Sequence, residues 1–248
     1  FLTLSDPAFS ISFVTERSQS FGNGLKKFAV RTILVLTAIL FINANTWGQT
    51  TRYWVGGANA SFAVAASWST TLGGAGNGAP VAGDILIVDG SDISSVAGAQ
   101  TGAVTINTLS TITLSSFTLQ NSADVTLTAA AGRTLTLGNG TGNDLVIQSG
   151  SALNISTNVS VTMAISSTGL IDGTLLIGAL RTFNSNNAGT LTTVNGSVYN
   201  AGTITTSTAR MTIANGSNYY HTRNGGGIPT ALWSDGSTCN VTGVSNTS

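Results

Sequence analysis

Apolar residues alternate with polar ones along much of the chain, in short runs separated by turn residues. From residue 104 onward most of these runs read apolar–polar–apolar, most often with threonine in the middle. Strict alternation places the apolar side chains on one face of a strand and the polar one on the other. Threonine suits a strand because it is β-branched, and it stays polar. The runs predict short strands at Val104–Ile106, Ile112–Leu114, Phe117–Leu119, Val125–Leu127, Leu135–Leu137, Leu145–Ile147 and Leu153–Ile155.

Turn motifs recur at a fixed interval in the C-terminal part of the chain. Asn-Gly-Ser or Asp-Gly-Ser triplets begin at Asn195, Asn215 and Asp235, so their spacing is constant, and Tyr199 and Tyr219 share it. A period of about 20 residues, built from strands and turns, is typical of a solenoid whose stacked coils bury a common core. The pattern therefore predicts an all-β fold, a right-handed parallel β-helix whose repeats occupy residues 101–248.

Residues 49–100 have a different texture and predict an N-terminal cap of the β-helix. They contain Trp54, Trp68, glycine-rich turns and the continuous apolar run Ile85–Val88, which is typical of a strand buried on both faces. An antiparallel β-sandwich is the alternative fold, because alternation alone does not separate the two. The scarcity of charged residues favours the β-helix, since the open edges of a sandwich need charges against aggregation.

The chain up to Gly48 divides into two segments. Residues 25–48 predict a secretory signal peptide, in which basic residues precede the apolar run Thr32–Ile42 and small residues precede a cleavage position after Gly48. The apolar run is about half the length that a bilayer-spanning helix requires. Residues 1–24 lie before this leader and are expected to be untranslated or disordered. At the other end no closing element is visible, which suggests that the repeats are truncated.

Two stretches of the chain carry distinctive motifs. The first contains Tyr53–Gly57, Ala66–Ser69, Pro80 and Gly83–Asp84, and the second contains Tyr220–Thr230, Trp233 and Ser237–Asn240. Both resemble secreted, repeat-rich β-helix proteins of bacterial surfaces, which include autotransporter-like adhesins and large exported proteins of Bacteroidetes. The resemblance implies a secreted or cell-surface location and an outer-membrane export route. It implies contact with a membrane only through the leader or a missing C-terminal sorting domain.

Charge is scarce in this chain, with 7% charged residues against about a quarter in an ordinary globular domain. Beyond Thr50 there is no lysine and no glutamate, so serine, threonine and asparagine must supply the polar surface. The arginines that remain form no basic stripe, and we therefore expect no nucleic-acid binding. The single cysteine, Cys239, has no partner for an intramolecular disulfide.

Calcium is the metal that the aspartates would suit, because Ca²⁺ prefers oxygen ligands on tight turns. Asp84, Asp89 and Asp92 form one candidate cluster. Asp144 lies in the segment 139–146, which is close to one copy of the nonapeptide that binds Ca²⁺ in β-rolls. Such sites need tandem copies, and each segment also has the composition of an ordinary turn. Turn formation is therefore the favoured interpretation, with Ca²⁺ as the alternative.

Catalytic chemistry finds few candidates in this sequence. Sugar cleavage needs two nearby carboxyl groups, and only Asp124 and Asp144, separated by the same interval as the turn motifs, are expected to stack on successive coils. His221 has no neighbouring acid or serine motif that would complete a triad. We therefore predict that the chain is not an enzyme.

Four aromatic residues, Tyr199, Tyr219, Tyr220 and Trp233, are the candidate ligand-binding residues. Exposed rings of this kind stack on sugars, whereas the alternative is that they pack as a C-terminal cap. The sequence thus predicts a secreted or cell-surface structural and adhesive module without catalysis, with glycans or proteins of a surface as partners. A polysaccharide-binding or polysaccharide-cleaving β-helix protein is the alternative.

Overall fold

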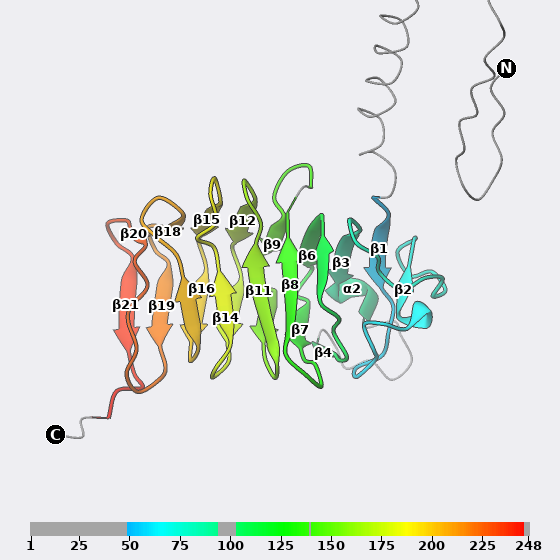
Figure 1. Cartoon of the computed structure of the whole chain (residues 1–248), viewed down its shortest axis with the longest axis horizontal. Coiled ribbons are helices and arrows are strands. Elements are labelled where there is room, and N and C mark those ends of the chain that lie inside the picture. Colours follow the sequence, from blue (N-terminus) through cyan, green and yellow to red (C-terminus); the bar gives the residue numbers. More distant parts are fainter. Residues whose placement is uncertain (1–48, 94–102, 139, 246–248) are drawn as a thin grey trace, which may run out of the picture. The chain divides into compact units, whose positions relative to one another are not determined.

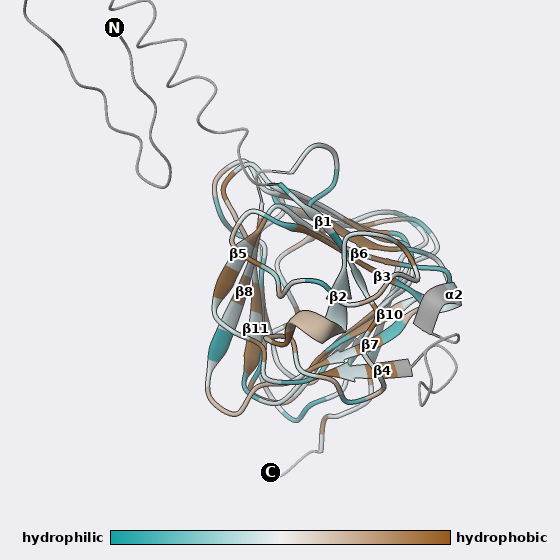
Figure 2. Cartoon of the chain, turned by 90° about the vertical axis from the view of Figure 1, so that its right-hand side faces the viewer, coloured by the Kyte–Doolittle hydropathy of each residue, from teal (hydrophilic) through white to brown (hydrophobic). Residues whose placement is uncertain are grey.

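The computed structural model describes residues 49–93, 103–138 and 140–245, so the predicted leader and the residues before it lie outside the described part. The described chain is a stack of coils, in which successive strands lie side by side along the long axis (Figure 1). Three sheets form the faces of the stack, and they enclose a roughly triangular cross-section (Figure 2).

The nine-stranded sheet contains, in spatial order, β2 (Trp68–Ser69), β1 (Thr51–Trp54), β3 (Ile85–Asp89), β6 (Ser116–Gln120), β9 (Leu145–Ile147), β12 (Thr168–Ile171), β15 (Leu191–Val194), β18 (Met211–Ile213) and β20 (Leu232–Trp233). The seven-stranded sheet contains β4 (Ala103–Ile106), β7 (Asp124–Leu127), β10 (Ala152–Ile155), β13 (Thr174–Ile177), β16 (Ser197–Asn200), β19 (Asn218–His221) and β21 (Thr238–Val241). The five-stranded sheet contains β5 (Ile112–Leu114), β8 (Arg133–Leu137), β11 (Val159–Met163), β14 (Thr182–Asn184) and β17 (Thr203–Thr205). Two single-turn helices, η2 (Ala65–Ser67) and α2 (Gly90–Ile93), lie in the N-terminal part.

Strand pairing settles the choice between the two predicted folds. Every pair is parallel except β1 with β2, which are antiparallel. A hairpin-built sandwich would show the opposite pattern, because hairpins join antiparallel strands. The parallel β-helix is therefore confirmed, and the antiparallel sandwich is wrong.

The alternation along each strand places one row of apolar residues inside the stack. In the seven-stranded sheet Val125, Leu153 and Leu175 pair in register on successive strands, and all three are fully buried. In the five-stranded sheet Leu135, Val161 and Phe183 form a second buried row in the same way. Since no single coil can bury its own apolar side, these rows hold one coil against the next.

Coil length varies, which the fixed period of the turn motifs did not predict. Asn218 of β19 pairs with Thr238 of β21, so this coil keeps the interval of the turn motifs. Asp124 of β7 pairs with Ala152 of β10, so the coil between them is considerably longer. Each connection of this longer coil exceeds its counterpart in the next coil, and the longest of them, from β8 to β9, contains the calcium-like segment.

An aromatic cluster lies at the N-terminal end of the described core. Trp54 and Trp68 are fully buried and meet edge to face, with ring centroids 4.9 Å apart. Phe62 packs against Trp68 at 5.6 Å, and its carbonyl oxygen accepts a hydrogen bond of 2.9 Å from the Trp68 indole N–H. The antiparallel strand β2 carries Trp68 to this position. The cluster thus lies at the start of the stack, where β1 already pairs in parallel with β3.

Candidate functional site

Two of the predicted aromatic residues form a stacked pair on the outside of the seven-stranded sheet. Tyr199 of β16 pairs in register with Tyr220 of β19, and their rings stack at a centroid distance of 4.4 Å and an interplanar angle of 4°. Tyr199 keeps 37% of its surface exposed. Burial and the nearby Tyr220 phenol raise the pKa of Tyr199. The pair is a flat aromatic surface of the kind that packs on a sugar ring.

The other two aromatic residues pack into the core, so only two of the four candidate ligand-binding residues lie on the outside. Tyr219 is fully buried and pairs in register with Val198, whereas the turn motifs predicted that it would align with Tyr199. Trp233 meets the Tyr219 ring edge to face at 5.6 Å. The interval of the turn motifs fails here because the coil from β16 to β19 is one position longer, which turns Tyr219 inward.

A chain of hydrogen bonds holds His221 inside the stack. Asn200 donates from Nδ2 to the Tyr219 hydroxyl at 2.9 Å, and that hydroxyl lies 3.3 Å from His221 Nδ1. His221 Nε2 lies 2.9 Å from the carbonyl oxygen of Gly225, which can only accept, so Nε2 carries the proton. Burial raises the pKa of Tyr219, and the Asn200 bond offsets this only in part. His221 thus anchors the loop after β19.

The outer face of the five-stranded sheet carries two rows of hydroxyl and amide side chains. One row contains Thr134, Ser160, Thr182 and Thr203, and the other contains Thr113, Thr136, Thr162, Asn184 and Thr205. All of these side chains are exposed or half-buried. Strand spacing sets about 4.8 Å between neighbours in a row, and the pleat sets about 6.6 Å between the rows. No charged residue interrupts either row.

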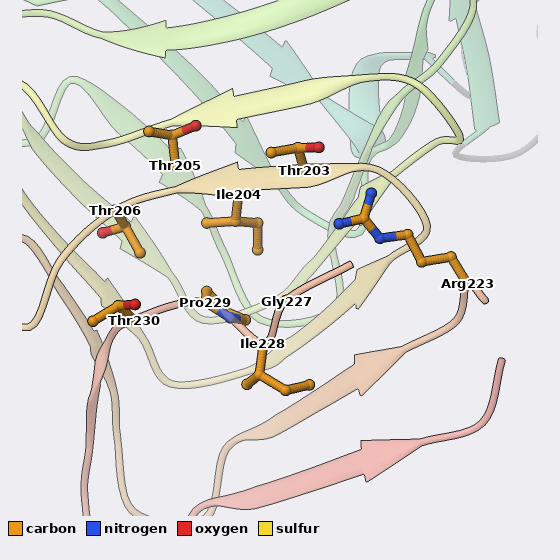
Figure 3. Close-up of a pocket in the computed structure, with 9 residues that line it drawn as sticks. All are labelled: Thr203, Ile204, Thr205, Thr206, Arg223, Gly227, Ile228, Pro229 and Thr230. Carbon is orange, nitrogen blue, oxygen red and sulfur yellow. The ribbon is translucent and has the colours of Figure 1, made fainter. Parts of the chain in front are cut away.

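A pocket of about 270 Å³ lies where these rows end, beside β17. The side chains of the strand form one wall and the loop after β19 forms the other (Figure 3). The residues that line the pocket are Thr203, Ile204, Thr205, Thr206, Arg223, Gly227, Ile228, Pro229 and Thr230. The sequence pattern did not predict this pocket. Its signal was the segment 224–229, where glycine and proline replace the threonine pattern of the earlier coils.

The candidate metal ligand Asp84 is a structural group. Arg52 donates from Nε to Asp84 Oδ2 at 2.5 Å, and Asp84 is fully buried. The backbone N–H groups of Thr50 and Val81 also donate to this carboxylate, at 3.3 and 3.0 Å. A carboxylate that accepts these bonds and faces a guanidinium holds the start of β3 next to β1.

Asp89 does not join Asp84, because β3 lies between the two carboxylates. The Asp89 carboxylate accepts hydrogen bonds from the Ser91 backbone at 2.9 Å and from the side-chain amides of Gln120 and Asn121 at 2.7 and 2.9 Å. Burial raises the pKa of Asp89, but the hydrogen bonds from Ser91, Gln120 and Asn121 outweigh it and lower the pKa below its usual 3.8. Asp92 lies in α2, and its side chain is outside the described part of the chain.

Asp144 accepts two backbone hydrogen bonds, from Gly140 at 2.9 Å and from Thr168 at 2.7 Å. It is buried next to β9 in the nine-stranded sheet, whereas Asp124 is exposed in β7 of the seven-stranded sheet. The expectation that Asp124 and Asp144 stack is therefore wrong, because Asp124 lies between Ala103 and Ala152.

Among the described residues, no three His, Cys, Asp or Glu side chains gather in a group that could hold a metal ion. No helix in the described part of the chain combines the length and the apolar character needed to span a bilayer. Searches with protein-family models, among curated proteins and among solved structures find no match to this chain.

Proposed function

We propose that this chain is an extracellular adhesive module that presents its outer faces to surface glycans and performs no catalysis. The observation that carries the proposal is the pair of unbroken rows of hydroxyl and amide side chains on the five-stranded sheet. Hydroxyl groups at a regular spacing on a rigid parallel sheet offer a repeating set of hydrogen-bond donors and acceptors. A polymer with a regular array of its own hydroxyl groups is the matching partner.

The exposed aromatic pair supports the same class of partner from a second face. Tyr199 and Tyr220 lie parallel and outward, and Leu176 precedes Tyr199 in the same outward row on β13. Such a flat apolar strip suits the C–H face of a sugar ring.

The proposal of a non-catalytic role rests on how the acidic and basic groups are used. Asp84, Asp89 and Asp144 accept hydrogen bonds that hold neighbouring coils together, and His221 bonds to the tyrosine hydroxyl and to a loop carbonyl. Groups that are engaged in this way are poor general acids and bases, because a reacting proton would have to displace a structural bond.

The test is retention of the mature chain on columns of insoluble polysaccharides, with cellulose, chitin and cross-linked alginate as the three matrices. We expect retention on at least one matrix and no release of reducing ends. The double variant Thr136→Val and Thr162→Val keeps the β-branched shape and removes two hydroxyls, so we expect weaker retention at an unchanged melting temperature. Thr118→Val and Thr193→Val on the nine-stranded sheet are the matched controls. Equal retention of both double variants would refute the role of the five-stranded sheet.

The aromatic pair is tested separately. Tyr199→Ala should weaken retention on the same matrix, whereas Leu191→Ala, an exposed apolar residue on the nine-stranded sheet, should not. Release of reducing ends that persists in highly purified protein would instead support the polysaccharide-cleaving alternative.

A further inference from the structure

The five-stranded sheet stops two coils before the other two sheets. After β17 the seven-stranded sheet continues with β19 and β21, and the nine-stranded sheet continues with β18 and β20. The chain between β19 and β20 forms a loop in place of a sixth strand. Gly225 and Gly226 both have positive φ angles, which favour glycine, and Gly226 lies against the Arg223 guanidinium. The pocket lies in the position that a sixth strand would occupy.

The edge of β17 that faces the pocket has free backbone groups. Thr203 donates its N–H to Arg181 of the preceding coil, and Thr205 accepts from Ser185, so both residues turn their backbone groups toward β14. Alternation along a strand then turns the N–H and C=O of Ile204 to the opposite side, toward the pocket. Among the described residues, no backbone hydrogen bond joins β17 to the loop 224–230.

The apolar core is also open at this point. Ile204 continues the inward row of Leu135, Val161 and Phe183, and those three are fully buried. Ile204 itself is only half-buried, because no further strand covers it. On the loop side Pro229 lies between Ile204 and Ile228 in Figure 3, and Ile228 is 42% exposed. An apolar side chain that entered here would extend the row by one residue.

One positive charge lies at the Thr203 end of the pocket, where Figure 3 places the guanidinium of Arg223. The Nε atom of Arg223 is buried and has no hydrogen-bond partner. The single ion pair in the described part of the chain joins Arg52 to Asp84, so Arg223 faces no carboxylate. A buried guanidinium nitrogen without a partner is costly, and a carboxylate is the group that satisfies it best.

We propose that this pocket binds an extended peptide segment that adds to the free edge of β17 as a sixth strand. Its backbone would pair with the N–H and C=O of Ile204, and an apolar side chain would pack against Ile204 and the loop residues Ile228 and Pro229. A carboxylate of the peptide, from its C-terminus or from an acidic side chain, would bind Arg223. Strand addition to an exposed sheet edge is a common mode of peptide recognition, in which the backbone supplies affinity and pockets supply selectivity. The free backbone edge favours a peptide over a glycan, which has no matching ladder of amides.

The test uses three short peptides of alternating threonine and isoleucine with a fluorescent label. The first has a free C-terminal carboxylate, the second has an N-terminal aspartate and a C-terminal amide, and the third is neutral at both ends. We expect the first or the second to bind, which identifies the source of the carboxylate, and the neutral peptide to bind about tenfold more weakly. Arg223→Gln should remove this preference, and Arg210→Gln, outside the pocket, should leave it intact.

Hydrogen exchange at the Ile204 amide gives a second readout that does not depend on a variant. We expect slower exchange of this amide when the peptide is bound, because a free edge N–H becomes a paired one. Absence of binding by all three peptides would overturn the proposal, and so would binding without protection of Ile204. Soluble alginate oligomers test the alternative of an acidic glycan. If they displace the peptide, and if in the absence of peptide they bind to the pocket without protecting Ile204, the pocket would be assigned to acidic glycans. Tyr199→Ala should leave peptide binding unchanged, so failure here and failure of the glycan proposal are distinguishable.

Discussion

Arg52 and Asp84 form a buried ion pair that joins the first two coils of the stack, with 2.5 Å between Arg52 Nε and Asp84 Oδ2. Arg52 lies in β1 and also donates to the carbonyl oxygen of Gly78 at 2.8 Å. Asp84 directly precedes β3, the parallel neighbour of β1. The pair therefore fixes the register at which the N-terminal strands meet.

Arg52→Met should be strongly destabilising, because it leaves the buried Asp84 carboxylate without its positive partner. The loss of a partner from a buried pair costs about 3–5 kcal/mol, and the two backbone donors that remain on Asp84 favour the lower end. Urea unfolding followed by circular dichroism measures the change. Arg133→Met, at an exposed position of β8, is the control and should change the free energy of unfolding little. Equal stability of the two variants would mean that the ion pair contributes nothing net.

Asp89 should make the fold sensitive to acid. Its pKa in the folded chain lies below the usual 3.8, because hydrogen bonds from Ser91, Gln120 and Asn121 outweigh the effect of burial. A lowered pKa contributes stability that is complete above the unfolded value and is lost as the pH falls through the folded value. Unfolding in urea at neutral pH and at stepwise lower pH should show this loss in the parent.

Asp89→Asn should be less stable than the parent at neutral pH and should show a shallower decline as the pH falls below 3.8. Asp235→Asn, in an exposed turn, is the matched control and should keep the slope of the parent. If Asp89→Asn lost stability with falling pH as steeply as the parent, the acid sensitivity would come from other carboxyl groups.

Phe183 is the largest side chain in the buried row of the five-stranded sheet, and it pairs in register with Val161 and Ile204. Phe183→Ala should cost about 3–5 kcal/mol, because it removes buried area and leaves a cavity between rigid coils. Leu180→Ala, at a side chain that is 88% exposed, is the control. A similar small loss in both variants would show that the coils collapse onto the cavity.

The alternation in the sequence was sufficient to predict the strands and their inward faces. Leu135, Leu145 and Leu153 are buried as their pattern predicted. When one face of a strand is covered, alternation assigns every apolar residue to that face. The parallel arrangement followed from the repeat and from the scarcity of charge. These features are local or periodic, so one amino-acid sequence is enough to predict them.

The register between coils was harder to predict, because it depends on the length of every connection. Asn195 and Asn215 mark one interval of the turn motifs, but the strands around them do not keep it. The offset is one position shorter on the nine-stranded sheet and one position longer on the seven-stranded sheet, where Ser197 pairs with Asn218. One residue of slip exchanges the inside and the outside of a strand. That slip makes Tyr220, rather than Tyr219, the partner of Tyr199.

The pocket beside β17 lies where a sixth strand of the five-stranded sheet would be. The only sign of this in the sequence is a break in the alternating pattern. The segment 224–229 has the composition of a turn, and nothing in it indicates that an isoleucine edge and a buried guanidinium meet there. Two of the candidate calcium ligands, Asp84 and Asp89, lie apart for a related reason. Asp84 and Asp89 are close in sequence, but the extended strand β3 separates them by about 17 Å.

Asp144 should stabilise its coil through its two backbone hydrogen bonds and not through a metal ion. Asp144→Ala leaves the Gly140 and Thr168 N–H groups without their acceptor, and we expect a cost of about 1–3 kcal/mol for each donor that stays buried. Asp144→Asn keeps one acceptor oxygen and should lose less. Thermal melting of both variants and the parent, each with excess Ca²⁺ and with a chelator, measures these differences. The parent should melt at one temperature in both conditions. A melting temperature that rises with Ca²⁺ in the parent and stays constant in Asp144→Asn would instead show that this turn binds calcium, since only a ligand that prefers the folded state raises its stability.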